Sequence, residues 1–365
     1  MLEEELFAIL RLQATPKIGT IITKKLIQII GSAEQIFREK KSSLLKIDGI
    51  GELLAQQIVS TKNLKKIEKE HSYVLENGVQ YSYFLDENYP KNLQNCIDGP
   101  VIFFHDGQMN WQHQKIISIV GTRNITNYGR AFCNQLVQDL ASYNPVIVSG
   151  FAYGADICAH KAAMDNNLQT IAVLAHGLDE IYPKTHKKYM HQVLANGGFI
   201  SEFWHDEPPM RENFLKRNRI VAGMADATVI IESAVKGGSL VTADIANSYH
   251  RDVFALPGRV DDTYSKGCNN LIKTHQAHLL SSAEDIIQLL NWNKKEKAIV
   301  QQPQLFLNLE PEEQIIYDYL QTNGKQLLDV IALDCKIPVY KLSSVLIQME
   351  LKNVVKALPG KMFEV

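Results

Sequence analysis

The sequence predicts an α/β protein built on a Rossmann-like, doubly wound parallel sheet, with a helical region before it and a winged helix after it. Between Tyr81 and Leu290, short Val- and Ile-rich runs alternate with helical stretches, which is typical of parallel βαβ units with both sheet faces covered. Short helical pieces precede this region, and three short helices with a hairpin follow it. We therefore expect a helical domain over 1–68, the sheet domain over 69–292, a linker over 293–310 and a winged-helix domain over 311–365.

Bulk composition excludes several classes of protein. A formal charge of -2 and a pI near 6.6 mean that any affinity for nucleic acid must come from a local patch. The five cysteines are scattered, odd in number and never in a CxxC pair, which argues against a zinc site and a disulfide framework. The N-terminus lacks a basic signal region and no apolar run reaches membrane length, so we expect a cytoplasmic protein with no membrane association, metal or cofactor.

The N-terminal region has two turns between helices, "TPKIG" at Thr15–Gly19 and "KIDGIG" at Lys46–Gly51. The second resembles a helix-hairpin-helix, or SAM-like, domain, in which backbone N–H groups at Gly49 and Gly51 could meet a phosphate. The alternative is a small helical bundle in which these glycines only separate helices, and Glu52, which would repel phosphate, slightly favours it.

The sheet region contains five segments that we expect to be strands: "KIISIVG", "PVIVSG", "TIAVLAHG", "ATVIIES" and "DVFALPG". Ligands of open parallel sheets bind beyond the carboxyl ends of the strands, and three of these ends lead into glycine-rich turns. The turn residues of interest are Gly121, Thr122 and Arg123, then Ser149, Gly150 and Gly154, and finally Gly238 and Ser239. None of the turns matches a mononucleotide-binding motif, and glycines in such turns are often only structural. The prediction of a phosphate-binding edge therefore rests on the occurrence of three such turns at the same edge of the sheet.

The run "MRENFLKRNRIVAG", Met210–Gly223, places four cations and one aromatic residue at the start of a helix. At 100° per residue, Phe214, Arg217 and Asn218 share one side, where they could supply a stacking face, a phosphate contact and an amide for a base edge. In the alternative interpretation, Phe214 packs in the core and the arginines pair with Glu202, Asp226 or Glu232. We expect mixed roles, with Arg217 on nucleic acid and Arg219 structural.

Other candidate sites are weaker. Asp156 and His160 stand four apart on a helix and could ligate a metal, but no third ligand at a familiar spacing accompanies them, so a local polar pair is the better interpretation. The segment "YPKTHKKYMH", which includes Lys184, predicts a basic rim rather than a catalytic site. Ser149 has no GxSxG elbow, so its hydroxyl is expected to form hydrogen bonds rather than to act as a nucleophile.

Seven blocks, in order, carry a resemblance to a known family: "VGTRNITNYGRA", "VSGFAYGADICAHKAA", "GLDEIYPKTH", "GGFISEF", "FLKRNRIVAG", "GGSLVTADIA" and "VFALPGRVDD…SKGCNNLI". They resemble the signature of the DNA-processing protein DprA (Smf) family over about residues 89–280. The resemblance implies a single-stranded-DNA-binding protein rather than an enzyme. Family members protect incoming strands during natural transformation, self-associate through the Rossmann-like domain and help load the recombinase RecA.

The resemblance also suggests DNA contacts. It carries the arginine of the first turn onto Arg123, the glycine-rich turn onto 149–154 and the FxxRNR segment onto 214–219. Two positions depart from the family pattern, because Tyr153 stands where arginine is common and Leu215 where proline usually follows the phenylalanine. Together, the turns and the cationic run give the expected DNA-binding residues: Gly121, Thr122, Arg123, Ser149, Gly150, Gly154, Lys184, Arg211, Phe214, Arg217, Asn218, Arg219, Gly238 and Ser239.

Two questions stay open at this point. The segment "KGGSLVTA" distantly resembles the glycine-rich turn of nucleoside-monophosphate glycosidases, so a nucleotide hydrolase or phosphoribohydrolase with Glu202 or Glu232 as catalytic carboxylate is the alternative function, although the PGGxGTxxE arrangement is missing. In the winged helix, the presumed recognition helix "PVYKLSSVLIQMELK" has few basic residues, so partner binding or self-association is as well supported as groove reading.

Overall fold

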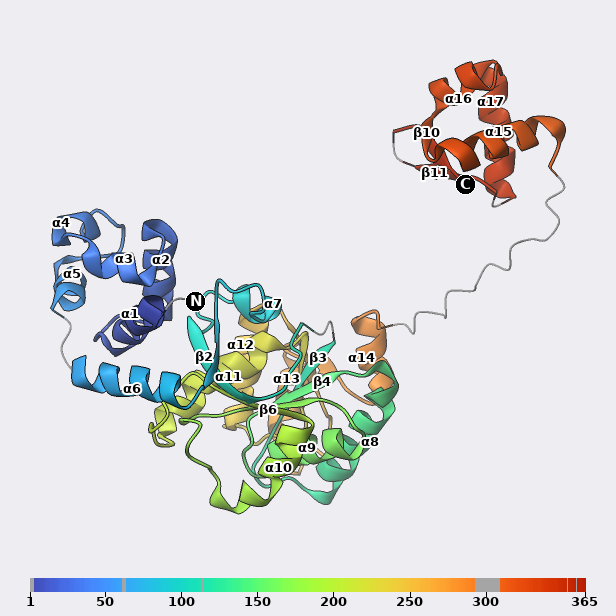
Figure 1. Ribbon diagram of the computed structural model, residues 1–365. Coiled ribbons are helices and arrows are strands. Elements are labelled where there is room, and N and C mark those ends of the chain that lie inside the picture. Colours follow the sequence, from blue (N-terminus) through green and yellow to red (C-terminus); the bar gives the residue numbers. More distant parts are fainter. Residues whose placement is uncertain (1–2, 61–63, 113–114, 293–308, 353, 359) are drawn as a thin grey trace. The chain divides into compact units, whose positions relative to one another are not determined.

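The computed structural model describes residues 3–60, 64–112, 115–292, 309–352, 354–358 and 360–365 (Figure 1). The chain forms two compact units, Met1–Lys294 and Lys295–Val365. Most of the expected linker lies outside the described residues, because only 309 and 310 of its positions belong to them. No helix in the described ranges is both long enough and apolar enough to cross a membrane.

Six helices open the first unit: α1 (Glu3–Ala14), α2 (Thr20–Ile30), α3 (Ala33–Arg38), α4 (Lys41–Leu44), α5 (Glu52–Val59) and α6 (Leu64–Glu76). The two turns singled out in the sequence have matching backbone conformations, since Lys17 (φ 65°) and Gly49 (φ 83°) are both left-handed. The expected domain boundary at residue 68 falls inside α6, which continues unbroken because its apolar residues Ile67 and Val74 are both buried.

Nine strands form one sheet in the order β1-β2-β6-β5-β4-β3-β7-β8-β9. Their bounds are β1 (Gln80–Tyr83), β2 (Ile102–Gly107), β3 (Ile116–Val120), β4 (Val146–Ser149), β5 (Thr170–Val173), β6 (Gly197–Ser201), β7 (Ala227–Ile230), β8 (Asp252–Ala255) and β9 (His278–Leu279). The pairs from β6 to β9 are parallel, whereas β2 runs antiparallel to both β1 and β6. The five expected strands are confirmed, and the sequence prediction lacked the other four.

The sheet is covered on both faces, as the alternating pattern predicts. Within β3, Ile117 and Ile119 pack with the helices α8 (Asn127–Leu140), α9 (Ala155–Asp165) and α14 (Ala283–Leu289). Ile116 and Val120 point the other way and join the core that contains α11 (Arg211–Met224), α12 (Gly238–Ser248) and α13 (Lys266–Lys273) (Figure 1). Two smaller helices, α7 (Lys91–Gln94) and α10 (Met190–Ala195), complete this unit with the 3-10 helices η1 (Ala141–Tyr143) and η2 (Lys184–Tyr189).

The strand order places a topological switch at β3. After β3 the chain continues to β4 on one side, and it later returns to β7 on the other side. The helices that follow β3 and β7 therefore lie on opposite faces, which leaves a crevice at the carboxyl ends of these strands.

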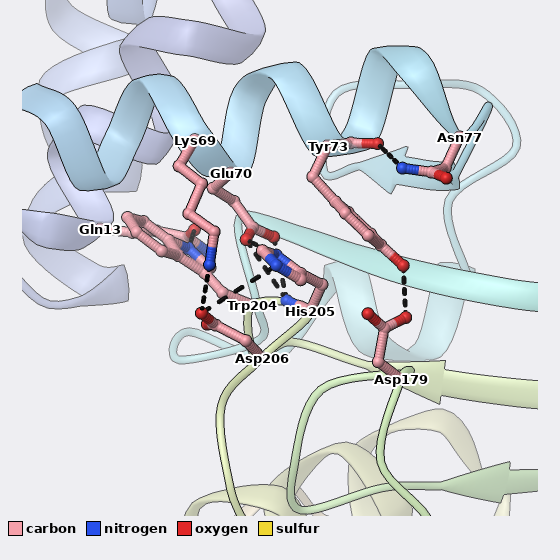
Figure 2. Close-up of polar contacts among 9 residues, drawn as sticks. All are labelled: Gln13, Lys69, Glu70, Tyr73, Asn77, Asp179, Trp204, His205 and Asp206. Carbon is pink, nitrogen blue, oxygen red and sulfur yellow. Dashed lines mark hydrogen bonds and ion pairs between the residues drawn. The ribbon is translucent and has the colours of Figure 1, made fainter.

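Helix α6 is held against the sheet region by polar contacts (Figure 2). The buried carboxylate of Glu70 accepts a hydrogen bond from the backbone N–H of His205 (3.1 Å) and also bonds to His205 Nδ1. Tyr73 stacks on this imidazole, with 3.8 Å between ring centroids, and its hydroxyl donates to Asp179. Because Asp179 follows β5 and His205 follows β6, these contacts tie α6 to the carboxyl end of the sheet.

The second unit is a winged helix with its own core. It contains α15 (Pro311–Asn323), β10 (Gln326–Leu327), α16 (Leu328–Asp334), α17 (Val339–Leu351), β11 (Lys356–Leu358) and β12 (Met362–Glu364), with the strands in the order β10-β12-β11. Ile316, Ile331, Leu342 and Leu346 pack together in its interior. Lys341 in the first turn of α17 pairs with Glu312 of α15, and Lys352 at the C-cap of α17 pairs with Glu313. The helix most similar to a recognition helix therefore presents little unpaired positive charge.

A buried histidine makes the stability of the sheet unit pH-dependent. His160 of α9 is fully buried, and burial, with further contributions from Arg217 and His186, lowers its pKa to about 3. The unfolded chain therefore binds one more proton than the folded chain between about pH 6.5 and pH 3, so stability falls as the pH drops through this window, by up to about 1.4 kcal/mol per pH unit. We expect urea unfolding of His160→Gln to show a shallower pH dependence than the wild type over this range, whereas exposed His191→Gln should not change it.

Candidate nucleic-acid interface

A cavity of about 610 Å³ lies at the switch point of the sheet. It is lined by the turns that follow β3, β4 and β7 and by one side of α11. Its charged lining residues, among those the structure describes, are Arg123, Asp156, Arg211, Arg217 and Lys236. The crevice thus combines four cations with one carboxylate on a chain that is almost neutral overall.

The turn after β3 presents Arg123 at the mouth of the crevice. Gly121 is required here, because an added Cβ would lie 2.8 Å from Cβ of Ala155 and within 3.2 Å of the backbone of Glu232. The backbone N–H of Thr122 donates to the Glu232 carbonyl (2.7 Å), which fixes the turn to the end of β7. Arg123 is exposed, and its guanidinium carbon lies 5.4 Å from the ring centroid of Phe214.

The turn after β4 packs tightly against the turn after β3. Gly154 has φ 77°, and a Cβ there would collide with the backbone of Thr122 and Arg123. Ser149 is fully buried and donates its hydroxyl to the carbonyl of Ile119 (2.6 Å). Its side chain therefore lies inside the sheet, and we assign it a structural role in place of the DNA contact expected from the sequence.

Helix α11 presents the side that the periodicity predicts, since Phe214, Arg217, Asn218 and Val221 all line the cavity. Phe214 is half-buried, with the guanidinium of Arg217 5.9 Å from its ring centroid. Asn218 accepts a hydrogen bond from Nε of Arg217 (3.3 Å).

Arg217 itself lies deeper than a direct phosphate contact requires. It is only 5% exposed, and Nη1 donates to the carbonyls of Gly150 (2.6 Å) and Val173. Asp156 on α9 is its buried counter-charge: burial raises the pKa of Asp156, while Arg217 and Arg123 act in the opposite direction. The DNA contact expected of Arg217 is therefore replaced by a positioning role, because its guanidinium is used by the protein interior.

Arg219 points to the other side of α11, where it pairs with Glu202 and donates to the carbonyl of Asp98. This agrees with the structural role expected for it, and it removes Arg219 from the residues that face the cavity. Lys184 also lies outside the cavity lining, exposed at the start of η2.

The N-terminus of α12 forms the remaining wall. Gly237 is its N-cap and makes no side-chain capping bond, and Gly238 has open space around it. Ser239 is buried and donates to the hydroxyl of Ser233 (2.9 Å). Lys236, which the sequence prediction omitted, is exposed and lines the cavity next to the N-terminus of α12. Its position directly before Gly237 and Gly238 could have identified it, because a cation beside a helix N-terminus favours an anion.

The two carboxylates considered for the alternative hydrolase function lie outside the cavity lining. Glu232 is buried and binds Thr126, accepting from its backbone N–H (2.8 Å) and its hydroxyl (2.5 Å) at the start of α8. Glu202 pairs with Arg219. Neither residue lines the cavity, so the arrangement that motivated a catalytic carboxylate is not formed.

Metal-ligating side chains come together at one place in the described ranges, in the group Glu70, His205 and Asp206. Lys69 already pairs with Asp206 (3.0 Å), and Glu70 is bound by His205, so this group fastens α6 rather than offering open ligands (Figure 2). The pair considered in the sequence also binds within the protein: Asp156 accepts from the backbone of Ala152 (3.2 Å), and Nδ1 of His160 bonds to the Thr170 hydroxyl (2.7 Å).

Comparison with known proteins agrees with this architecture. Residues 80–291 match the family model of DNA recombination-mediator protein A, and residues 301–361 match that of the DprA winged helix domain. The chain belongs to the DNA recombination-mediator protein A family. Protein Smf of Synechocystis is 32% identical over 279 residues, which cover 74% of this chain and 69% of that relative.

Two solved structures of DNA processing protein A are similar to this member of the family. The Streptococcus pneumoniae protein has a TM-score of 0.66 and 29% identity, covering 79% of this chain and 98% of that one. The Helicobacter pylori protein, whose structure was described for its single-stranded DNA binding mode, has a TM-score of 0.53 and 32% identity, covering 58% of this chain and 96% of that one.

The burial of Arg217 in this family member predicts a large effect on stability. Arg217→Met removes the donor to the carbonyls of Gly150 and Val173 and the positive charge near the buried Asp156 carboxylate, which should lower the free energy of unfolding by about 3–5 kcal/mol. Arg211→Met, on the exposed first turn of the same helix, should change it by less than about 0.5 kcal/mol. Urea denaturation measures both values, and equal small effects would contradict the positioning role.

Proposed function

We propose that this protein binds single-stranded DNA in the crevice at the switch point and acts as a recombination mediator. The observation that carries the proposal is the contact between Arg123 and Phe214, an exposed guanidinium over a half-buried aromatic ring at the mouth of a cationic cavity. Single strands are held by cations that follow the phosphates and by aromatic faces on which bases stack. The similar Helicobacter pylori protein, described for its single-stranded DNA binding mode, supports the same substrate.

The shape of the crevice favours a single strand over a duplex. The bases of a duplex are stacked and paired, so they cannot reach Phe214 at the wall of a 610 Å³ cavity without being extruded. An unpaired nucleotide can enter and place its phosphates near Arg123, Arg211, Lys236 and the N-terminus of α12. Backbone amides and cations contact phosphate and not base edges, so we expect little dependence on sequence.

The biological role follows from this substrate and from the family. We propose that the protein acts in the cytoplasm, protects strands that enter during natural transformation and helps to load RecA on them. Self-association through the Rossmann-like domain would place two crevices on one assembly, so that one strand could bind to both and gain affinity through effective concentration.

Substitutions at the mouth of the crevice should separate its two kinds of contact. Arg123→Ala removes one phosphate contact, so we expect weaker binding and a logarithmic salt slope that is shallower by about 0.7. Phe214→Ala removes a stacking face, so we expect a loss of about 1–3 kcal/mol with little change in slope. Fluorescence anisotropy of a labelled dT12 strand over a NaCl series measures both quantities.

The matched controls are a duplex of the same length and Arg38→Ala, an exposed arginine of α3 far from the turns in sequence. Duplex should bind more weakly than dT12, and Arg38→Ala should behave as wild type. Binding that is equal for duplex and single strand, or that is unchanged in both crevice variants, would show that the crevice is not the DNA site.

A further inference from the structure

Two exposed tyrosines continue the aromatic surface of the crevice beyond its lining. Tyr182 is 37% exposed, and its ring meets Phe214 edge-on, with 5.6 Å between centroids and 69° between planes. Tyr153, in the turn between β4 and α9, is 43% exposed. The hydroxyl of Thr185 donates to that of Tyr153 (3.0 Å), which joins this ring to the segment that carries Tyr182. We call Phe214, Tyr182 and Tyr153 the aromatic strip.

The outer ring of the strip is fixed by buried neighbours. His186 is buried, and its Nδ1 bonds to the carbonyl of Phe151 (3.0 Å). The ring of Tyr153 packs against this imidazole with 5.0 Å between centroids and 72° between planes. A tyrosine that is held in place yet keeps almost half of its surface exposed offers a stacking face at a low cost in conformational entropy.

Positive charge accompanies the strip. Lys184, Lys187 and Lys188 are exposed on η2, directly after the segment with Tyr182. Two exposed acidic residues, Asp179 and Glu180, precede this segment, and Asp179 accepts a hydrogen bond from the Tyr73 hydroxyl. A single strand needs aromatic faces for its bases and cations for its phosphates, and the strip and η2 offer one kind of contact each.

We propose that the aromatic strip is a second stacking station, at which the bases that leave the crevice stack on Tyr182 and Tyr153 while the lysines of η2 bind the intervening phosphates. The proposal rests on single-strand binding in the crevice and extends it along one direction, from α11 towards the turn after β4. It makes affinity depend on the presence of bases outside the cavity as well as inside it.

The test compares two labelled 12-mers with the same number of phosphates, dT12 and a fully abasic strand, by anisotropy with the full-length chain. Tyr153→Ala should weaken dT12 binding about tenfold and leave abasic binding unchanged, because only stacking is removed. Tyr153→Phe should bind both strands as wild type does. Tyr153→Arg should tighten abasic binding and steepen the salt slope, because it exchanges a base contact for a phosphate contact. Tyr340→Ala, which truncates an 80% exposed tyrosine of the winged helix, is the control and should change neither affinity.

Four results would overturn the proposed stacking station. Tyr153→Ala could lower the affinity for both strands equally, which would mean that the substitution acts on the structure. It could also leave both affinities unchanged, which would mean that the ring does not contact DNA. If Arg123→Ala weakens dT12 binding while Tyr153→Ala does not, the crevice is the DNA site and only the proposal of a stacking station is wrong. If the wild type binds neither 12-mer, both the proposed DNA-binding function of the crevice and the stacking station are wrong.

Discussion

The buried guanidinium of Arg217 is the interaction on which the crevice depends. From α11 it reaches the carbonyl of Gly150 in the turn after β4 and that of Val173 at the end of β5, and it faces Asp156 on α9. Four elements are thus joined by one charge, and an unpaired charge in this interior would be expensive. A Cβ at Gly150 would collide with the guanidinium, so a larger residue at this position would displace the Arg217 side chain. The ring of Phe214 and the amide of Asn218 owe their positions to this anchor.

Some cations near the crevice stabilise the protein interior and others remain exposed, which explains how an almost neutral chain can form a nucleic-acid site. Arg217 and Arg219 are used by the interior, one against Asp156 and backbone carbonyls and the other against Glu202. Arg123, Arg211 and Lys236 remain at the surface of the cavity, next to the N-terminus of α12. Positive charge therefore gathers where three turns meet, on a chain that is almost neutral overall.

Much of the architecture was predictable from local patterns, and the exceptions have physical reasons. Runs such as "KIISIVG" and "ATVIIES" identify buried parallel strands, because both sides of such strands must be apolar. The strand β6 begins with two glycines, which carry no periodicity, and β1 and β2 add antiparallel pairs that the βαβ pattern does not contain. Gly107 and Gly198 are needed where β2 and β6 approach, since a Cβ on Gly107 would meet Gly198 Cα at 2.8 Å and one on Gly198 would meet the Asp106 carbonyl oxygen at 2.1 Å.

The sequence by itself determined the sheet class, the winged helix, the family and the side of α11 that faces the crevice, because periodicity and ordered motifs are properties of local sequence. Tertiary structure alone decided how deep each residue on that side lies. Arg217 and Phe214 share one side of α11, yet one guanidinium is buried against β4 and β5 while the ring remains at the mouth beside Arg123 and Tyr182. How deeply a side chain is buried depends on neighbours from strands that are distant in sequence, and the spacing of residues along a single helix does not reveal those neighbours.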